Sequence, residues 1–286
     1  MTQSKVLNPE SINEVLSMIE EYGEDTRVIA GGQSLVPMIS LGLYQPNFLI
    51  NLSNCKDLTS IKKTRKILNI GAMVSVSELI NSNQINDFVP VLDFAAKKVA
   101  TPHVRNFGTV VGNVCHADPS SDLIPALLCL NAQIDLLSVT GERCVSIGDF
   151  ITGPYSTNIR SGEIASSVTC HVERGSKLAS YKKIARRAGD LGIATCAANL
   201  TISKGLIKYA GISVGGYLQK AIRLVDIEKN LINYPINESL KSINQIGKID
   251  VVEDTILPEG SLTSSYLSGT FSRLVKLTLR DAIHGR

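Results

Sequence analysis

Residues 27–35 read Arg-Val-Ile-Ala-Gly-Gly-Gln-Ser-Leu, in which an apolar run at 28–30 is followed by two glycines. The run 27–30 predicts a short buried strand, because a continuous apolar stretch bounded by glycine is typical of one. Glycine accepts positive φ and lets the backbone approach a ligand closely, and successive backbone N–H groups in such a turn can converge on an anion. Ser34 adds a hydroxyl donor. Residues 30–35 therefore suit a phosphate, although a Gly-Gly turn alone is more often only a turn.

A second turn, rich in glycine and carboxamides, is predicted at residues 105–113, Arg-Asn-Phe-Gly-Thr-Val-Val-Gly-Asn. We expect residues 107–113 to form a loop, and a leucine-rich helix to follow over 119–130. The start of that helix could direct backbone N–H groups toward negative charge, and Asp122 could accept hydrogen bonds from a ribose hydroxyl. The simpler alternative is that a serine just before Asp122 caps the helix and Asp122 complements its dipole.

Two phosphate-type turns on separate segments are more specific than either turn alone. A dinucleotide has a pyrophosphate that two such turns could hold from opposite sides. The chain has no Gly-x-x-x-x-Gly-Lys-Ser/Thr segment, and no Gly-x-Gly-x-x-Gly segment opens a helix. Neither a P-loop nucleotidase nor a Rossmann NAD domain is therefore predicted.

The pattern of apolar residues changes near residue 175. Before it, strands and helices alternate, which indicates α/β organisation; the predicted elements are a helix at 11–21, strands at 48–52 and 66–72, a capping box at 75–78, a helix at 89–99, a hairpin at 133–147 and a strand at 163–172. After it, antiparallel strands are predicted, with a tight turn at 204–205; these strands lie at 180–185, 194–203 and 206–214. An amphipathic helix is predicted over 266–283. We therefore expect an α/β region up to about residue 175 and an α+β region after it, and we assign the chain as a whole to the α+β class.

Composition excludes several classes of protein. Charged residues make up 19% of the chain and the net charge of +3 is scattered, so nucleic-acid binding is not predicted. No apolar run is long enough to span a bilayer, and residues 1–10 lack the apolar core of a secretory signal. These features predict a cytoplasmic protein without a membrane span.

The cysteines and histidines do not predict a metal centre. The six cysteines are dispersed with no Cys-x-x-Cys pair, which favours reduced core thiols over an iron–sulfur cluster. His116 and Asp118 form the only weak pair at ligand spacing, whereas catalytic zinc needs about three protein ligands. If this chain moves electrons, its redox centre would be organic.

Four ordered segments resemble a known family, and the resemblance extends over essentially the whole chain. Residues 30–38, 104–113, 117–119 and 181–190 look like the FAD-binding medium subunit of the xanthine dehydrogenase and carbon monoxide dehydrogenase family of molybdenum hydroxylases. The resemblance implies a vanillyl-alcohol-oxidase-type (PCMH) FAD-binding fold. It would comprise two α/β subdomains at residues 1–55 and 56–174, and a C-terminal α+β domain of antiparallel sheet and helices at 175–286.

The resemblance also implies roles for individual residues. Residues 31–35 and 109–113 would hold the FAD pyrophosphate, Asp122 would bind the adenosine half, and Ser166 would lie where a strand passes the flavin. Lys182 would lie near the flavin ring, where its cation could favour reduced, anionic flavin. No catalytic residue and no metal ligand is expected, because the cofactor supplies the chemistry. The complete set implied to bind FAD is Ile29, Ala30, Gly31, Gly32, Gln33, Ser34, Leu35, Thr101, Gly108, Thr109, Val110, Val111, Gly112, Asn113, His116, Asp118, Asp122, Ser166 and Lys182.

The chain departs from the family pattern at two positions. Val111 stands where the second turn usually has glycine, and a β-branched residue disfavours positive φ. Leu191 stands where some members carry an aromatic residue beside the flavin. The valine suggests that the backbone of the second turn, or its approach to the phosphate, differs from the family pattern. The leucine suggests that the flavin ring has no aromatic side chain stacked beside it.

The function implied by the resemblance is electron transfer within a larger complex. A large molybdopterin subunit would oxidise substrate, a small subunit would carry two [2Fe–2S] clusters, and FAD in this chain would pass electrons to an external acceptor. A dimer of heterotrimers is expected. Two alternatives stay open: a self-sufficient FAD-dependent oxidoreductase of the same fold, and a flavin-free scaffold subunit, which Val111 would favour.

Overall fold

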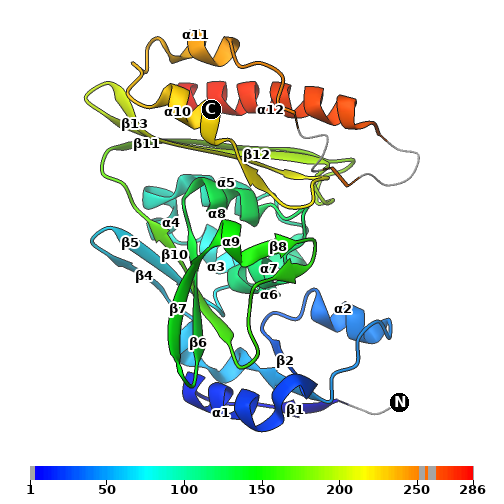
Figure 1. The fold of residues 1–286 in the computed structure, drawn as a ribbon. Helices are drawn as coiled ribbons and strands as arrows, with labels where there is room; N and C mark the ends of the chain where they lie inside the picture. Colours follow the sequence, from blue (N-terminus) through cyan, green and yellow to red (C-terminus); the bar gives the residue numbers. More distant parts are fainter. Residues whose placement is uncertain (1–3, 251–254, 257–261, 286) are drawn as a thin grey trace.

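The computed structural model describes residues 4–250, 255–256 and 262–285, and within them three sheet units follow one another along the chain (Figure 1). The first unit is a parallel sheet in the order β1 (Lys5–Leu7), β3 (Phe48–Asn51), β2 (Thr26–Ile29). Helix α1 (Ile12–Tyr22) begins after Ser11, whose hydroxyl accepts the Glu14 N–H, and it buries Val15 and Ile19. The helix and the two strands predicted here are confirmed as elements. The predicted burial of residues 27–30 is wrong, because Arg27 is exposed and residues 28–30 are only half-buried at this side of the sheet.

A short helix, α2 (Leu35–Ser40), follows the first predicted turn and stands to one side of the first sheet (Figure 1). None of its residues is buried. Short 3-10 turns at Gly23–Asp25, Leu52–Asn54 and Lys56–Leu58 complete the connections of this region.

The second unit is an antiparallel five-stranded sheet in the order β4-β5-β10-β6-β7. Its strands are β4 (Ile61–Thr64), β5 (Ile67–Gly71), β6 (Gln133–Ser138), β7 (Gly141–Ser146) and β10 (Ile164–His171). Its helices are α3 (Val76–Ile80), α4 (Asn83–Phe88), α5 (Pro90–Ala96), α6 (Pro102–Phe107), α7 (Val110–His116), α8 (Leu123–Cys129) and α9 (Ile147–Phe150), and β8 (Ile151–Gly153) pairs with β9 (Ser156–Thr157). The capping box predicted at the start of α3 is confirmed, since Ser75 and Glu78 bond to each other's backbone N–H.

Two predictions in this unit are wrong. Residues 107–113 are not one loop, because α6 ends at Phe107 and α7 begins at Val110. Thr101 and Thr109 each accept a backbone N–H three residues ahead, and these caps start the two helices. The helix predicted from residue 119 begins only at Leu123.

The third unit is an antiparallel sheet in the order β11 (Ser176–Ile184), β12 (Ala194–Ser203), β13 (Leu206–Gly216), β14 (Ile222–Arg223). The predicted turn between β12 and β13 is confirmed: Lys204 and Gly205 have φ of 52° and 73°, as a two-residue hairpin turn requires. Helices α10 (Val225–Leu231), α11 (Ser239–Asn244) and α12 (Ser264–His284) complete the unit.

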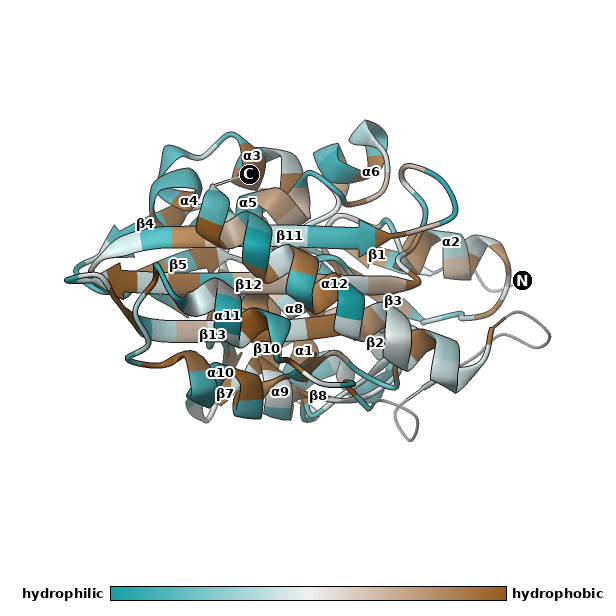
Figure 2. Ribbon diagram, turned by 90° about the horizontal axis from the view of Figure 1, so that it is seen from above, coloured by the Kyte–Doolittle hydropathy of each residue, from teal (hydrophilic) through white to brown (hydrophobic). Residues whose placement is uncertain are grey.

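The third sheet is covered on both faces. Helix α12 runs along β11 and β12 on one face (Figure 2), and α5 and α8 of the second unit lie against the other face (Figure 1). A core around Leu200 and Phe271 therefore fills the α12 side. A second, continuous core joins the first and second units and extends to the facing side of the third sheet; it includes Val15, Leu127 and Tyr181. The α+β class is confirmed, whereas the predicted subdomain limits at 55/56 and 174/175 stay predictions.

No helix among the described residues is long and apolar enough to cross a membrane. The predicted cytoplasmic location stays a prediction. The prediction about a secretory signal includes residues 1–3, which lie outside the described residues.

Candidate functional site

The two turns predicted from the sequence lie against each other. A Cβ atom on Gly31 would lie 1.9 Å from the carbonyl oxygen of Phe107 and 2.9 Å from the Cα of Gly108. A Cβ on Gly108 would lie 3.6 Å from Cγ of Gln33. The first turn therefore touches the junction of α6 and α7, and glycine at position 31 is what allows this approach.

The first turn presents backbone donors that have no acceptor. Within the described residues, the N–H groups of Gly32, Gln33, Ser34 and Leu35 form no hydrogen bond. Gly32 adopts a left-handed φ of 69°, which redirects the chain after Ala30. The Gln33 carboxamide donates to the Gly31 carbonyl over 3.2 Å and braces the turn. Consecutive free N–H groups in a left-handed turn form a concave site for an anion.

The second turn is fixed more firmly. The Thr109 hydroxyl accepts the Gly112 N–H over 3.1 Å, and the Val110 N–H donates to Val74 over 3.1 Å. Gly108 is bonded through its carbonyl to the Val76 N–H over 2.9 Å. A Cβ on Gly112 would lie 3.9 Å from the Ala30 Cβ, so this turn also reaches the end of β2.

Val111 fits this arrangement without strain. It lies inside α7, has no positive φ and is buried. The expectation that a β-branched residue would disturb the turn is therefore wrong, because the position is helical and a helix does not require glycine.

His116, Asp118 and Thr101 lie at the ends of the same helices. The His116 ring lies 5.2 Å from the Tyr155 ring. Oδ1 of Asp118 accepts the Ser120 N–H over 2.9 Å and the Ser120 hydroxyl over 2.7 Å, which turns the chain toward α8. Thr101 is exposed and caps α6.

Ser166 lies at a β-bulge where β10 changes register against β6. Its hydroxyl donates to the Asp135 carbonyl over 3.1 Å, and its own carbonyl accepts the Ala72 N–H over 2.9 Å. A bulge re-aims the chain locally, but here the hydroxyl is already bonded within the sheet.

Asp122 is used differently from the sequence prediction. Its carboxylate accepts the Tyr181 hydroxyl at Oδ1 and the Lys183 ammonium at Oδ2, both over 2.7 Å. Asp122 is 5% exposed. Burial raises the pKa of its carboxyl, although Lys183 acts in the opposite direction. The ribose contact stays a prediction, which this buried, internally bonded carboxylate does not favour.

Lys182 lies on the other face of β11. Its ammonium pairs with Asp281 of α12 over 2.5 Å. Successive side chains of a strand point to opposite faces. Tyr181 and Lys183 therefore face α8 of the second unit, whereas Lys182 faces α12. The predicted position of Lys182 beside a flavin ring stays untested, and this orientation does not support it.

The sequence alternative in which a serine just before Asp122 caps the helix is confirmed, because the Ser121 hydroxyl accepts the N–H groups of Leu123 and Ile124. Sequence reasoning missed the bond from Ser121 to the second turn, and it missed Tyr181 and Lys183 as partners of Asp122. The Ser121 hydroxyl donates to Oδ1 of Asn113 over 2.5 Å. A nearby loop also reaches the site, since a Cβ on Gly189 would lie 3.3 Å from the Ala100 carbonyl. The alternation of Tyr181 and Lys183 in β11 was the available signal, but the sequence did not show which face of the strand meets α8.

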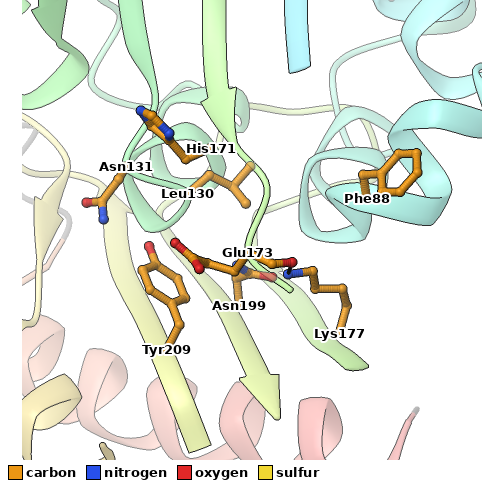
Figure 3. A pocket seen from close by; sticks show the side chains of 8 residues that line it. All are labelled: Phe88, Leu130, Asn131, His171, Glu173, Lys177, Asn199 and Tyr209. Carbon is orange, nitrogen blue, oxygen red and sulfur yellow. Dashed lines mark hydrogen bonds between the residues drawn. The ribbon is translucent and has the colours of Figure 1, made fainter. Parts of the chain in front are cut away.

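Two pockets lie away from these turns. One, of about 20 Å³, lies between the end of β10 and strands β11–β13 (Figure 3). A groove of about 600 Å³ lies along α10 and residues 242–249. In the described part of the chain no three His, Cys, Asp or Glu side chains could hold a metal ion. All six cysteines are free, and Cys144 is exposed, so the prediction of core thiols is wrong for that one residue.

The glycine backbone, the free N–H groups and the second turn pressed against them form a site of the kind that holds a diphosphate, as in proteins that bind nucleotide cofactors. Comparisons with known proteins agree. Residues 2–170 match the FAD binding domain in molybdopterin dehydrogenase, and residues 179–248 match the CO dehydrogenase flavoprotein C-terminal domain. The chain belongs to the FAD-binding medium-subunit family of molybdenum hydroxylases and is an oxidoreductase subunit.

Several relatives support this assignment over most of their length. The glyceraldehyde dehydrogenase medium chain of Sulfolobus acidocaldarius is 33% identical over 81% of this chain and 82% of its own. The nicotine 6-hydroxylase medium subunit of Paenarthrobacter nicotinovorans is 30% identical over 96% of this chain and 95% of its own.

Solved structures agree as well. A cyanide-inactivated Cu,Mo-CO dehydrogenase matches with a TM-score of 0.89 and 26% identity over 98% of both chains. Quinoline 2-oxidoreductase from Pseudomonas putida 86 matches with a TM-score of 0.85 and 26% identity over 99% of this chain and 98% of its own. The predicted PCMH-type fold and the FAD cofactor are confirmed.

Proposed function

We propose that this chain relays electrons from a small subunit with [2Fe–2S] clusters, through FAD, to an external acceptor. A large molybdopterin subunit would oxidise the substrate, in a dimer of heterotrimers. The observation that carries the proposal is the contact of Gly31 with Phe107, which joins the turn with four free N–H groups to the second turn.

The residues present fit a dinucleotide. The free N–H groups of residues 32–35 are donors suited to pyrophosphate oxygens, and the Ser34 hydroxyl can add another. Thr109 and Gly112 hold the second turn in place through their mutual hydrogen bond. Bound FAD would supply the electron-carrying chemistry, whereas the chain's own residues bind and orient it.

We retain residues 29–35, Thr101 and residues 108–113 as the FAD-binding set, with His116 and Asp118 at its edge. Asp122, Ser166 and Lys182 enter the proposal as structural residues. The carboxylate of Asp122 is bonded to Tyr181 and Lys183. The Ser166 hydroxyl is bonded to the Asp135 carbonyl, and the Lys182 ammonium pairs with Asp281.

The alternatives are less well supported. A self-sufficient oxidoreductase would need its own substrate site, yet relatives of nearly this length are named medium chains or subunits. The scaffold alternative depended on Val111, and that residue fits α7 without strain.

The test is purification of the chain alone and with its two partner subunits. We expect the chain to release FAD on denaturation, and the complex to contain molybdenum and iron. The flavin should be reduced by the substrate of the complex only when both partners are present. Reduction of the flavin in the isolated chain by that substrate would establish the self-sufficient alternative, and a colourless chain that takes up no added FAD would establish the scaffold.

A further inference from the structure

We propose that the C-terminal domain positions the second turn through Tyr181 and Lys183, which act on Asp122. The inference rests on the proposed function, because the position of this turn matters most if the turn holds FAD. The first step is the contact between units: both side chains come from β11, and both bond to the one carboxylate at the start of α8 over 2.7 Å. Lys183 also donates to the Lys98 carbonyl over 3.2 Å.

The second step leads from Asp122 to the turn. Its neighbour Ser121 is buried, and the Ser121 hydroxyl accepts the N–H groups of Leu123 and Ile124 over 3.2 and 3.4 Å. The same hydroxyl donates to Oδ1 of Asn113, the last residue of the turn. Any shift of Asp122 therefore moves Ser121 and, with it, the hydrogen bond that anchors Asn113.

The third step concerns how firmly Asp122 is held. The side chains of Lys183 and Asp122 are 8% and 5% exposed. Water can therefore reach neither charge unless the contact between β11 and α8 opens. A buried pair is strongly position-dependent, since loss of one partner leaves an uncompensated charge. Tyr181 and Lys183 are thus positioning residues for the second turn and have no direct contact with it.

The experiment compares Lys183→Met with Lys208→Met in the full chain. Lys208 lies on β13 of the same sheet and is exposed, and within the described residues its ammonium donates only to Oδ1 of Asn233, so it is a matched control. We expect Lys183→Met to weaken FAD binding about two- to thirtyfold and to speed amide hydrogen exchange in residues 108–116 of the FAD-free chain. Lys208→Met should leave both unchanged, and Lys183→Arg should restore both.

Tyr181→Phe keeps the design decisive if Lys183→Met does not fold, because it removes one hydrogen bond and leaves the ion pair. It should change exchange and affinity in the same direction by a smaller amount. Equal values of FAD affinity and exchange for the Lys183→Met and Lys208→Met variants would overturn the inference, as would values for Tyr181→Phe equal to those of the unmodified chain. If the unmodified chain binds no FAD, the proposed function fails, while the exchange measurement still decides whether β11 controls the turn.

A different observation carries a second inference. Oδ1 of Asn199 on β12 is buried and has no hydrogen-bond partner among the described residues. Asn199 lines the pocket between β10 and β11–β13, together with Glu173 and Tyr209 (Figure 3). An unsatisfied buried acceptor is unfavourable, and native proteins usually supply a partner. We propose that one ordered water occupies this pocket and donates to Asn199.

The size of the pocket selects this ligand. About 20 Å³ admits one water-sized centre and excludes any cofactor or substrate. The polar groups of Glu173 and Tyr209 give such a water further partners. It would join the segment between β10 and β11 to the sheet of the C-terminal domain.

The test is a crystal structure of the full chain, alone or in its complex, at a resolution that shows waters. We expect one water within hydrogen-bond distance of Oδ1 of Asn199, and its loss in Asn199→Leu. Asn131→Ala, an exposed change at the same pocket, should keep the water. An empty pocket in the unmodified chain, or an Asn199 carboxamide bonded to a protein group in place of water, would overturn the inference.

Discussion

The α-carbon of Gly31 faces the carbonyl oxygen of Phe107 so closely that a Cβ would lie 1.9 Å from it. Real Cβ atoms essentially never approach a backbone oxygen within 3.0 Å, so these two residues can meet only while position 31 is glycine. The contact joins β2 and α6, elements of two different sheet units. It sets how the two turns of the FAD site lie relative to each other.

Gly31→Ala should therefore separate the two turns. Overpacking costs about 1–3 kcal/mol, and here the neighbour is backbone, which cannot rotate away. We expect FAD affinity to fall about tenfold or more, as measured by equilibrium dialysis or flavin fluorescence. Gly153→Ala is the control, because no atom lies within 4 Å of its Cβ and its φ is not positive. Unchanged FAD affinity in Gly31→Ala would contradict the role of this contact.

Val111→Gly would restore the glycine that the family pattern has at this position, and we expect it to lower stability. The change removes a buried side chain from α7 and places glycine in a helix. The combined loss is about 2–4 kcal/mol of unfolding free energy, measurable by urea denaturation. FAD affinity of the folded fraction should not rise. A tighter FAD complex in this variant would mean that valine impairs the turn after all.

Two strands of the first sheet, β2 and β3, and the turn after β2 were predictable because their signals are local, whereas β1, only three residues long, was not predicted. An apolar run followed by two glycines specifies β2 and the turn after it, and Ser75 with Glu78 specifies the start of α3. The second turn was harder. Glycines suggested a loop, yet Thr101 and Thr109 each cap a short helix. Threonine is a less strongly preferred N-cap residue than serine, aspartate or asparagine.

The face of β11 could not be read from the sequence. Strand alternation separates Lys182 from Tyr181 and Lys183, but both faces of this sheet are covered, one by α12 and the other by α5 and α8. Hydrophobic pattern assigns a face only when one side meets water. Lys182 pairs with Asp281, which lies on a helix about a hundred residues further along the chain. Only the tertiary structure could show this pair.

The Arg143–Glu163 pair should give stability an acid dependence. Hydrogen bonds from Arg143 at 2.6 and 2.7 Å lower the pKa of Glu163 below its usual value. Stability from this pair is fully present above the unfolded pKa of Glu163 and is lost as pH falls through its lower folded pKa. Glu163→Gln should thus be less stable than the unmodified chain at neutral pH, and the difference should narrow on acidification. Denaturation from pH 7 to pH 3, about the range in which glutamate titrates, tests this. A constant difference would contradict it.

Two aspartates on opposite faces of the third sheet should differ in their contribution to stability. Asp122→Ala leaves the buried ammonium of Lys183 without its carboxylate, and breaking a buried pair costs about 3–5 kcal/mol. Asp281→Ala breaks a pair in which both side chains are 31% exposed, and such pairs contribute about 0–1 kcal/mol. Urea denaturation of both variants gives the comparison. Equal losses of unfolding free energy in the two variants would mean that water reaches the Lys183 ammonium once Asp122 is removed. The ion pair would then not hold β11 against α8.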